Sequence, residues 1–328
     1  MIKGASILIT GGTGSWGQEL TRQLLPLKPK EIIIFSRNES NQVAMSRSLR
    51  HPALKFRIGD IRDRSAVTDA SKGVDFIFHL AALKHVPVCE DQPYEALKTN
   101  VVGTQNVIEA AIENRVKKVL YLSTDKAANP SNFYGMTKAI GEKLILYANI
   151  IPSETAFVCV RSGNVLGTSG SVVHLFNKQI REEGRIGITD RRMTRFFLTV
   201  HDAVRLLIKA LEDSVGGEIF VMAMPTCRIL DLAEVLAEAS GRSDVEIVEI
   251  GKRPGEKIHE ILFSEYESQH VAKYNDDYFV ILPTFDLPRV QKRYASCPRV
   301  TMNTYSSDLS PLGKEEVRRL LAKGGFLP

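Results

Sequence analysis

The feature that most restricts the fold of this chain is the alternation, over its first half, of short apolar runs with segments of helical period. Strands that alternate with helices along a sequence form a parallel sheet covered by helices on both faces. The runs predicted to be strands are residues 6–10, 31–35, 55–58, 75–81, 118–124 and 157–161. We therefore expect an α/β fold with a doubly wound parallel sheet.

Three glycines follow the first predicted strand. Gly11, Gly14 and Gly17 form the pattern G-x-x-G-x-x-G at the start of a helical segment. The first glycine permits the turn, the second lets the backbone approach a phosphate, and the third lets the helix pack on the strand. The N–H groups of the helix start then face a pyrophosphate. We predict a Rossmann-type domain that binds a nicotinamide dinucleotide through Gly11, Thr13, Gly14, Ser15, Trp16 and Gly17.

The residues after the second predicted strand bear on the choice of dinucleotide. An NAD-selective protein commonly has an acidic residue there, whereas Ser36 and Arg37 favour the 2′-phosphate of NADP. Glu39 could still bind a ribose, which keeps NAD open as the less favoured cofactor. Further cofactor contacts are predicted at Asn38, Asp60, Ile61, Ala81, Ala82, Lys84, Asn100, Leu122 and Ser123.

A cluster of reactive side chains follows the fifth predicted strand. That strand ends at Thr124, and Asp125 and Lys126 come next, at the carboxyl edge of the sheet where such folds bind ligands. Tyr134 and Lys138 are four residues apart and share one face of a helix. We expect the ammonium of Lys138 to lower the pKa of Tyr134 and to hold the nicotinamide ribose. Tyr134 is then a base for the proton of a sugar hydroxyl.

Asp125 and Lys126 add an acid and a base that hydride transfer alone does not need. Thr124, Tyr134 and Lys138 would suffice for a dehydrogenase, so the added pair indicates a second bond-breaking step. The alternative is an ion pair in a loop that faces solvent.

These motifs together resemble the UDP-N-acetylglucosamine 4,6-dehydratases of the extended short-chain dehydrogenase/reductase superfamily. The likeness is especially close to the inverting members that start pseudaminic acid synthesis, and it extends to about Pro283. In its most specific part, residues 123–130, Lys126 stands where related retaining dehydratases have glutamate. The matching segments are residues 10–17, 81–87, 122–130, 134–138, 161–165, 189–196 and 253–257.

The resemblance implies a catalytic cycle on UDP-N-acetylglucosamine with NADP. Tyr134 removes the proton of the C4 hydroxyl as hydride leaves C4. Lys126 then removes the C5 proton, while protonated Asp125 assists loss of the C6 hydroxyl as water. Return of hydride to C6 and reprotonation of C5 from the opposite face give a UDP-2-acetamido-2,6-dideoxy-4-keto-hexose. The cycle needs a neutral Lys126, and we expect burial beneath the sugar to lower its pKa.

The resemblance also implies where the sugar nucleotide binds. Arg195 and Arg253 are candidates for the UDP phosphates, because guanidinium groups match phosphate oxygens. Glu256 is a candidate for the uridine ribose. We expect no more than one arginine of residues 191–195 to contact the ligand. The other predicted substrate contacts are Lys84, Asn164, Val172, Val173 and Thr189.

The pattern of the chain changes after residue 165. Helices are predicted at residues 199–213 and 229–240, strands at 218–222 and 245–250, and a last basic helix after residue 314. We expect residues 1–165 to form the NADP-binding domain and residues 166–328 a smaller lobe that binds the UDP-sugar, with the chain partly interleaved between the two.

Composition and charge argue against several classes of protein. The 43 basic and 38 acidic residues leave a net charge of +5, which suits an anionic ligand but not nucleic-acid binding. Neither a bilayer-spanning apolar run nor a signal peptide is evident, so we expect a cytoplasmic protein without a membrane partner. The four cysteines form no CxxC pair, and no metal site is expected. The resemblance suggests a homo-oligomer, either a dimer or a hexamer.

Several other functions stay open at this point. A retaining 4,6-dehydratase, an enzyme that releases a 5,6-ene and a UDP-sugar epimerase would all use Tyr134 and the same cofactor. A non-catalytic nucleotide-binding subunit would keep the glycine loop. The presence of Tyr134, Lys138, Asp125 and Lys126 together argues against that subunit.

Overall fold

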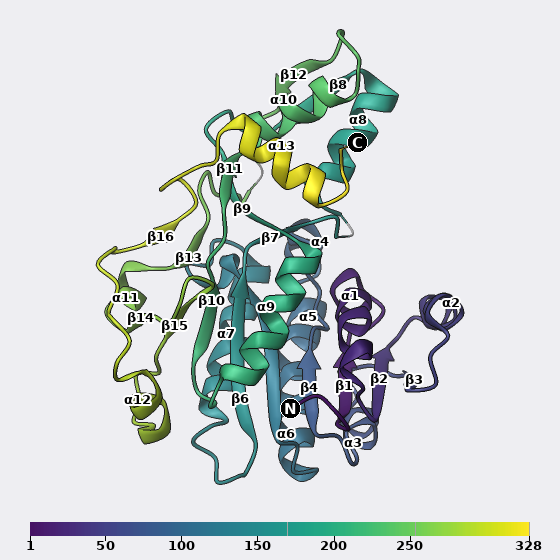
Figure 1. Ribbon diagram of the computed structural model, residues 1–328, viewed down its shortest axis with the longest axis vertical. Helices are drawn as coiled ribbons and strands as arrows, with labels where there is room; N and C mark the ends of the chain where they lie inside the picture. The colour runs from purple at the N-terminus through teal and green to yellow at the C-terminus, as the bar shows by residue number, and fades with distance from the viewer. Residues whose placement is uncertain (169, 253, 328) are drawn as a thin grey trace.

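A large sheet forms the centre of the protein (Figure 1). The structure is a computed structural model that describes residues 1–168, 170–252 and 254–327. Within these residues, nine strands join in the order β14-β15-β10-β6-β5-β4-β1-β2-β3. Neighbours pair in parallel, except that β15 runs antiparallel to both β10 and β14. The strands are β1 (Ser6–Thr10), β2 (Glu31–Ser36), β3 (Leu54–Ile58), β4 (Phe76–His79), β5 (Lys118–Thr124), β6 (Ala156–Ser162), β10 (Ile219–Met222), β14 (Val271–Lys273) and β15 (Tyr278–Ile281).

Helices cover both faces of this sheet, as a parallel sheet requires. On one face α1 packs against α9, and on the other α6 packs against α3 and α7. Some of the elements are joined by the short 3-10 helices η1 (Leu25–Leu27) and η3 (Asp125–Ala127) and by the π-helix η2 (Lys98–Val102). The helices are α1 (Ser15–Leu24), α2 (Glu39–Leu49), α3 (Arg64–Ala70), α4 (Val86–Asp91), α5 (Pro93–Leu97), α6 (Gly103–Glu113), α7 (Phe133–Tyr147), α9 (Val200–Asp213), α11 (Glu265–Ser268) and α12 (Pro288–Tyr294).

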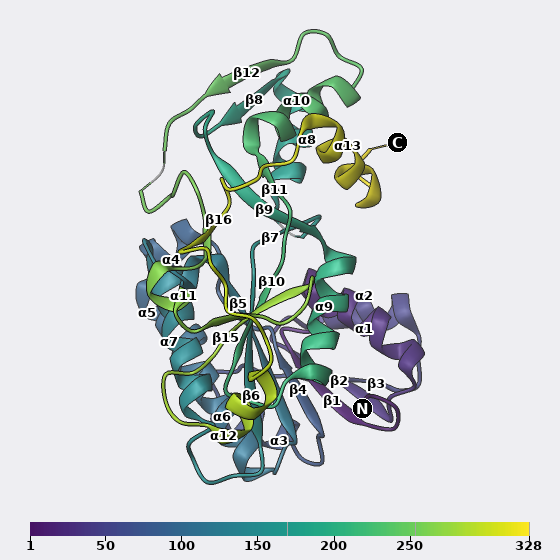
Figure 2. The ribbon, with the colours of Figure 1, turned by 60° about the vertical axis from the view of Figure 1, so that its left-hand side comes forward.

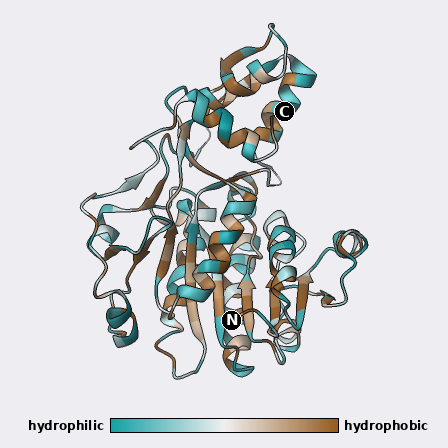
Figure 3. Ribbon diagram, viewed as in Figure 1, coloured by the Kyte–Doolittle hydropathy of each residue, from teal (hydrophilic) through white to brown (hydrophobic). Residues whose placement is uncertain are grey.

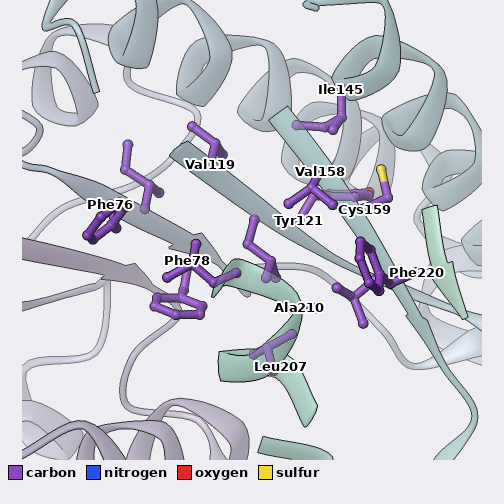
Figure 4. Close-up of a cluster of buried hydrophobic side chains, with 14 of the residues drawn as sticks. Phe76, Phe78, Val119, Tyr121, Ile145, Val158, Cys159, Leu207, Ala210 and Phe220 are labelled. Atoms are coloured by element: carbon purple, nitrogen blue, oxygen red, sulfur yellow. The ribbon is translucent and has the colours of Figure 1, made fainter. Parts of the chain in front are cut away.

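The main hydrophobic core lies between the sheet and these helices. In Figure 4, Ile145 of α7 lies on one side of the strands and Leu207 of α9 on the other, and both are fully buried. Figure 3 shows the matching division of hydropathy, with mostly apolar strands inside and polar stretches on the outer helices. The predicted α/β fold with a doubly wound, mostly parallel sheet is therefore confirmed.

A second, smaller core lies beyond the carboxyl edge of the sheet, at the top of Figure 2. Three helices form most of it: α8 (Val172–Glu183), α10 (Ile229–Ala239) and α13 (Lys314–Lys323). Short strands form three further small sheets, in the orders β11-β9-β7, β12-β8 and β13-β16. These strands are β7 (Asn164–Leu166), β8 (Arg185–Ile188), β9 (Thr194–Thr199), β11 (Thr226–Arg228), β12 (Glu246–Glu249), β13 (Ile261–Phe263) and β16 (Tyr305–Ser306).

The chain passes between the two cores more than once. The predicted helix and strand at residues 199–213 and 218–222 are α9 and β10, and both pack with the large sheet. The chain then enters the second core at α10 and returns to the sheet at β14 and β15. The sequence pattern did not predict β14 and β15, because strands of three and four residues show little periodicity. The division into domains at residue 165 stays a prediction.

Helix α7 lies close to β5, which matters for the site. A Cβ atom at Gly141 would come within 2.2 Å of the Tyr121 hydroxyl oxygen, so glycine permits this approach. At the other end of α7, the Asn132 side chain accepts a hydrogen bond from the N–H of Gly135 at 2.9 Å and caps the helix. The first turn of α7, with Tyr134, is thereby held beside the end of β5.

Candidate active site

A cavity of about 1140 Å³ lies between the carboxyl edge of the large sheet and the second core. Residues from both parts of the chain line it, as expected for a dinucleotide and a sugar nucleotide bound end to end. The predicted site residues that line it are Gly11, Thr13, Gly14, Ser15, Trp16, Gly17, Ser36, Arg37, Asn38, Asp60, Ile61, Ala81, Ala82, Lys84, Leu122, Ser123, Thr124, Lys126, Tyr134, Lys138, Asn164, Val172, Thr189, Arg195 and Glu256.

Four predicted residues are placed differently. Glu39 is exposed at the start of α2, away from the cavity lining. Asn100 is buried, and its side chain bonds to the backbone of the 80–85 loop at 2.8 and 2.9 Å, so it supports that loop. Val173 is fully buried in the second core. Asp125 is buried beneath the lining residue Lys126, and Arg253 lies outside the described residues.

The glycine loop has the shape that a pyrophosphate needs. Gly11 has a positive φ of 68°, and a Cβ there would lie 2.9 Å from the backbone of Ala81. A Cβ at Gly17 would lie 2.4 Å from the carbonyl oxygen of Gly12, so helix α1 packs directly on the loop. Gly14 is the N-cap of α1 and offers no side-chain acceptor to its first N–H groups. The residues present therefore fit a phosphate group at this helix start.

Charged residues mark the far end of the cavity, beside β2 and β3. The Arg37 guanidinium is half-exposed and lies 3.9 Å from the Asp60 carboxylate. Arg62 also binds Asp60, with contacts of 2.6 and 2.8 Å. Burial would raise the pKa of Asp60, but the hydrogen bonds and charge of Arg62 outweigh burial and lower it. Arg37 is thus positioned to meet an anionic group at this end.

Thr124, Asp125 and Lys126 form a connected cluster at the end of β5. The Thr124 hydroxyl donates to Asp125 Oδ1 at 2.8 Å, and the Lys126 ammonium donates to the same oxygen at 3.0 Å. The Asp125 side chain is only 1% exposed, and its second oxygen has no hydrogen-bond partner among the described residues. The alternative of a solvent-facing ion pair is therefore wrong.

Two carboxylates determine the protonation of Lys126 in the protein without its sugar. Burial alone would lower its pKa, but attraction to Asp125 and Glu260 is stronger and raises the pKa above the ordinary value. Asp125 contributes most to this rise, and Glu260, whose Oε1 lies 3.3 Å from the ammonium, adds to it. The lowered pKa expected beneath a bound sugar stays a prediction.

The pair Tyr134 and Lys138 departs from the prediction. Burial raises the pKa of Tyr134 to about 12, with Lys126 and Thr124 acting in the opposite direction. Lys138 instead donates to the Leu122 carbonyl at 2.7 Å and lies 3.8 Å from the centre of the Tyr121 ring. Burial lowers the pKa of Lys138 to about 7. The cation that reduces the pKa of Tyr134 is therefore Lys126 rather than Lys138.

Arg195 lines the cavity, but the backbone occupies much of its guanidinium. Nη1 donates to the carbonyls of Thr194 at 2.7 Å and Ile258 at 2.9 Å, and Nη2 donates to that of Lys257 at 2.9 Å. The carboxylate of Glu256 lies 3.9 Å away. Arg195 therefore holds residues 256–258 in place at the wall of the cavity. It does so whether or not its guanidinium also contacts a ligand.

Glu260 is a cavity residue that the sequence interpretation missed. It is 3% exposed and lies just before β13, close in space to η3. No strand pattern or catalytic motif in the sequence singles it out.

No group of three or more His, Cys, Asp or Glu side chains among the described residues is arranged to hold a metal ion. No described helix combines the length and apolar character needed to span a bilayer.

Comparison with known proteins identifies the family. The sequence model of the family described as "Polysaccharide biosynthesis protein" matches residues 7–282. The chain belongs to this family. The match covers the large sheet from β1 to β15 as well as much of the second core.

Individual members of the family are similar over most of the chain. A Campylobacter jejuni protein named UDP-N-acetylglucosamine 4,6-dehydratase (inverting) is 45% identical, over 87% of this chain and 84% of that protein. A Rickettsia typhi protein named UDP-glucose 4-epimerase is 44% identical, over 83% and 80%. The X-ray structure of Pen from Bacillus thuringiensis superposes with a TM-score of 0.91 at 40% identity, covering 98% of this chain and 99% of that one. The resemblance to the inverting dehydratases is thus confirmed.

Proposed function

We propose that this protein is a hydro-lyase that converts UDP-N-acetylglucosamine to a UDP-2-acetamido-2,6-dideoxy-4-keto-hexose, with NADP and with inversion at C5. The observation that carries the proposal is the hydrogen-bonded cluster of Thr124, Asp125 and Lys126, two of which, Thr124 and Lys126, line the same cavity as Tyr134. The name of the Campylobacter relative supports the same reaction.

Tyr134 serves as the base for the C4 hydroxyl. A bound nicotinamide dinucleotide supplies the acceptor for the C4 hydride and the donor for C6. With a pKa of about 12, Tyr134 is protonated between turnovers. The nearby Lys126 charge and the Thr124 hydrogen bond already act to lower this pKa, and without them the ionised form that acts as the base would be rarer still. Once C4 is a ketone, the C5 proton becomes acidic.

Asp125 and Lys126 provide the acid and the base for the loss of water. Moving one proton along the 3.0 Å hydrogen bond from Lys126 to Asp125 makes the amine neutral and the carboxyl protonated. The total number of protons is unchanged, so the reactive form is a tautomer of the resting ion pair. Lys126 then takes the C5 proton, and Asp125 gives its proton to the departing C6 hydroxyl. The pair is then back in its resting form, C5 takes a proton from solvent on the opposite face, and Tyr134 releases the C4 hydroxyl proton to solvent.

The rest of the cavity divides between cofactor and substrate. We assign Arg37 and Ser36 to the 2′-phosphate, which favours NADP over NAD. We assign the UDP-sugar to Lys84, Asn164, Val172, Thr189, Arg195 and Glu256, all of which line the cavity. Four further statements complete the proposal. The chain divides into its two domains at residue 165, and the protein is cytoplasmic. It forms a dimer or a hexamer and acts in the pathway to pseudaminic acid or another bacterial surface glycan.

A second candidate is 4-epimerisation of a UDP-sugar, because the Rickettsia relative named UDP-glucose 4-epimerase is 44% identical. Incubation of the purified protein with UDP-N-acetylglucosamine, followed by mass spectrometry and NMR of the product, separates the two. The dehydratase forms a product lighter by one water. A product of unchanged mass with an altered C4 configuration would favour the epimerase, and unchanged UDP-N-acetylglucosamine would argue against both reactions on this substrate.

A further inference from the structure

Glu260 is a buried carboxylate that the proposed cycle does not use. Its backbone is fixed by Ser307, whose hydroxyl accepts from the Glu260 N–H at 3.0 Å and whose N–H donates to the Glu260 carbonyl at 2.9 Å. Its side-chain Oε1 lies 3.3 Å from the Lys126 ammonium. Its Oε2 is buried and has no hydrogen-bond partner within the described residues. Such a carboxylate is costly to bury unless it neutralises a charge.

The charge that Glu260 neutralises is that of Lys126 rather than that of Arg195. Arg195 Nε is 3.9 Å from Glu260 Oε1, beyond hydrogen-bond distance, and the two terminal nitrogens of Arg195 already donate to backbone carbonyls. Lys126 reaches Asp125 on one side and Glu260 on the other. The ammonium is therefore held between two carboxylates that come from distant parts of the chain.

We propose that Glu260 is a positioning residue for Lys126, which holds the amine at the sugar edge of the cavity and keeps it protonated between turnovers. This inference rests on the proposed role of Lys126 as the C5 base. Because Glu260 stabilises the Lys126 ammonium, it favours the resting ion pair. It also favours the transfer of the C5 proton to Lys126, the step that regenerates this ion pair. The charged or titratable groups that act on Lys126 are Asp125, Glu260, Arg195, Lys257 and Tyr134.

The test compares Glu260→Gln, which removes the charge but keeps the shape, with the wild type. The pH dependence of Lys126 acetylation by acetic anhydride, measured by mass spectrometry of its peptide, reports the protonation of the amine without any turnover. An opposite charge at this distance shifts a pKa by about 1–3 units. We expect the labelling midpoint of Lys126, and the alkaline limb of the kcat profile, to move ~1–3 pH units lower in the variant. An unchanged labelling midpoint would overturn the proposal.

Two further variants serve as a control and as a second test. Glu218→Gln makes the same substitution at a fully buried carboxylate that also has an unpartnered oxygen but lies outside the cavity lining, and it should leave Lys126 labelling unchanged. If Glu260→Gln fails to fold, Glu260→Asp keeps the charge but shortens the reach. We expect Glu260→Asp to lower kcat while the labelling midpoint moves less than one unit. Wild-type kcat and labelling in Glu260→Asp would contradict the positioning role.

The outcomes also distinguish this inference from the proposed function. If the wild type releases water from UDP-N-acetylglucosamine but Glu260→Gln labels as the wild type does, only the role of Glu260 fails. If the wild type does not dehydrate the sugar while the labelling midpoint still shifts, the charge coupling holds and the proposed reaction fails.

Discussion

Replacing Lys126 with methionine should separate oxidation of C4 from loss of water. Methionine keeps most of the side-chain volume but cannot take the C5 proton or supply one to Asp125 along the 3.0 Å hydrogen bond. General acid–base catalysis contributes about 10²–10⁴-fold to a rate. Since one substitution removes the base and the proton source of the acid, we expect kcat for dehydration to fall by ~10⁴-fold, about 5 kcal/mol in activation free energy. Proton removal by Tyr134 should persist but slow, because Lys126 is one of the two groups that lower the pKa of Tyr134.

The same variant should lose stability. The side chains of Asp125 and Glu260 are 1% and 4% exposed and would lose their shared ammonium. Removing one partner of a buried ion pair costs about 3–5 kcal/mol. The loss should shrink as pH falls, because protonation removes the uncompensated charge. Urea unfolding at several pH values measures it.

The assay for Lys126→Met follows two signals in a single turnover. Absorbance of the reduced nicotinamide reports oxidation of C4, and mass spectrometry reports the loss of water. The exposed Lys143→Met substitution on α7 is the matched control and should leave both signals unchanged. Dehydration within tenfold of the wild-type rate, or simultaneous loss of both signals, would refute the role assigned to Lys126.

Three further predictions concern the cofactor end of the cavity and its buried lysine. Gly17→Ala puts a Cβ 2.4 Å from the Gly12 carbonyl oxygen, so we expect a loss of about 1–3 kcal/mol in unfolding free energy and weaker dinucleotide binding. The control is Gly313→Ala, whose Cβ would have its nearest neighbour at 3.8 Å and should change neither property. Equal melting temperatures for the two variants would count against the packing argument. Arg37→Ala should weaken NADP binding by calorimetry roughly tenfold or more while NAD binding changes little, and equal losses for the two cofactors would contradict the assignment of the 2′-phosphate. Burial lowers the pKa of Lys138 from 10.5 to about 7, so between these pH values the unfolded chain binds one more proton than the folded protein. The unfolding free energy of the cofactor-free protein should therefore fall as the pH drops from 10.5 to 7. Lys138→Met should flatten this pH dependence in urea titrations, and the same pH dependence in the variant and the wild type would contradict the prediction.

The elements near the glycine loop could be predicted because local pattern determines them. β1 and β5 begin and end at the predicted residues, and the close contacts of Gly14 and Gly17 lie within a single βα unit. The spacing of tyrosine and lysine is less informative. Tyr94 and Lys98 share it, yet Tyr94 is 68% exposed, with the Lys98 amine 4.6 Å from its ring centre. What distinguishes Tyr134 is the contact of α7 with β5.

The protonation states could not be predicted from the sequence. The pKa of Lys126 depends on Glu260, which reaches it only because β13 lies beside η3. The pKa of Tyr134 depends on how deeply α7 is buried and on the direction of Lys138, which turns toward the Leu122 carbonyl. Both effects act through space between segments that are distant in the chain. A residue such as Glu260 therefore becomes visible only in the folded protein.

The most direct test of the central claim is the reaction of UDP-N-acetylglucosamine in deuterated water, followed by NMR of the product. If Lys126 removes the C5 proton and C5 is reprotonated from the opposite face, the product carries deuterium at C5 and has the inverted configuration there. It is also a 4-keto-6-deoxy sugar. A dehydrated product without deuterium at C5, or with C5 retained, or a sugar recovered unchanged, would contradict this account.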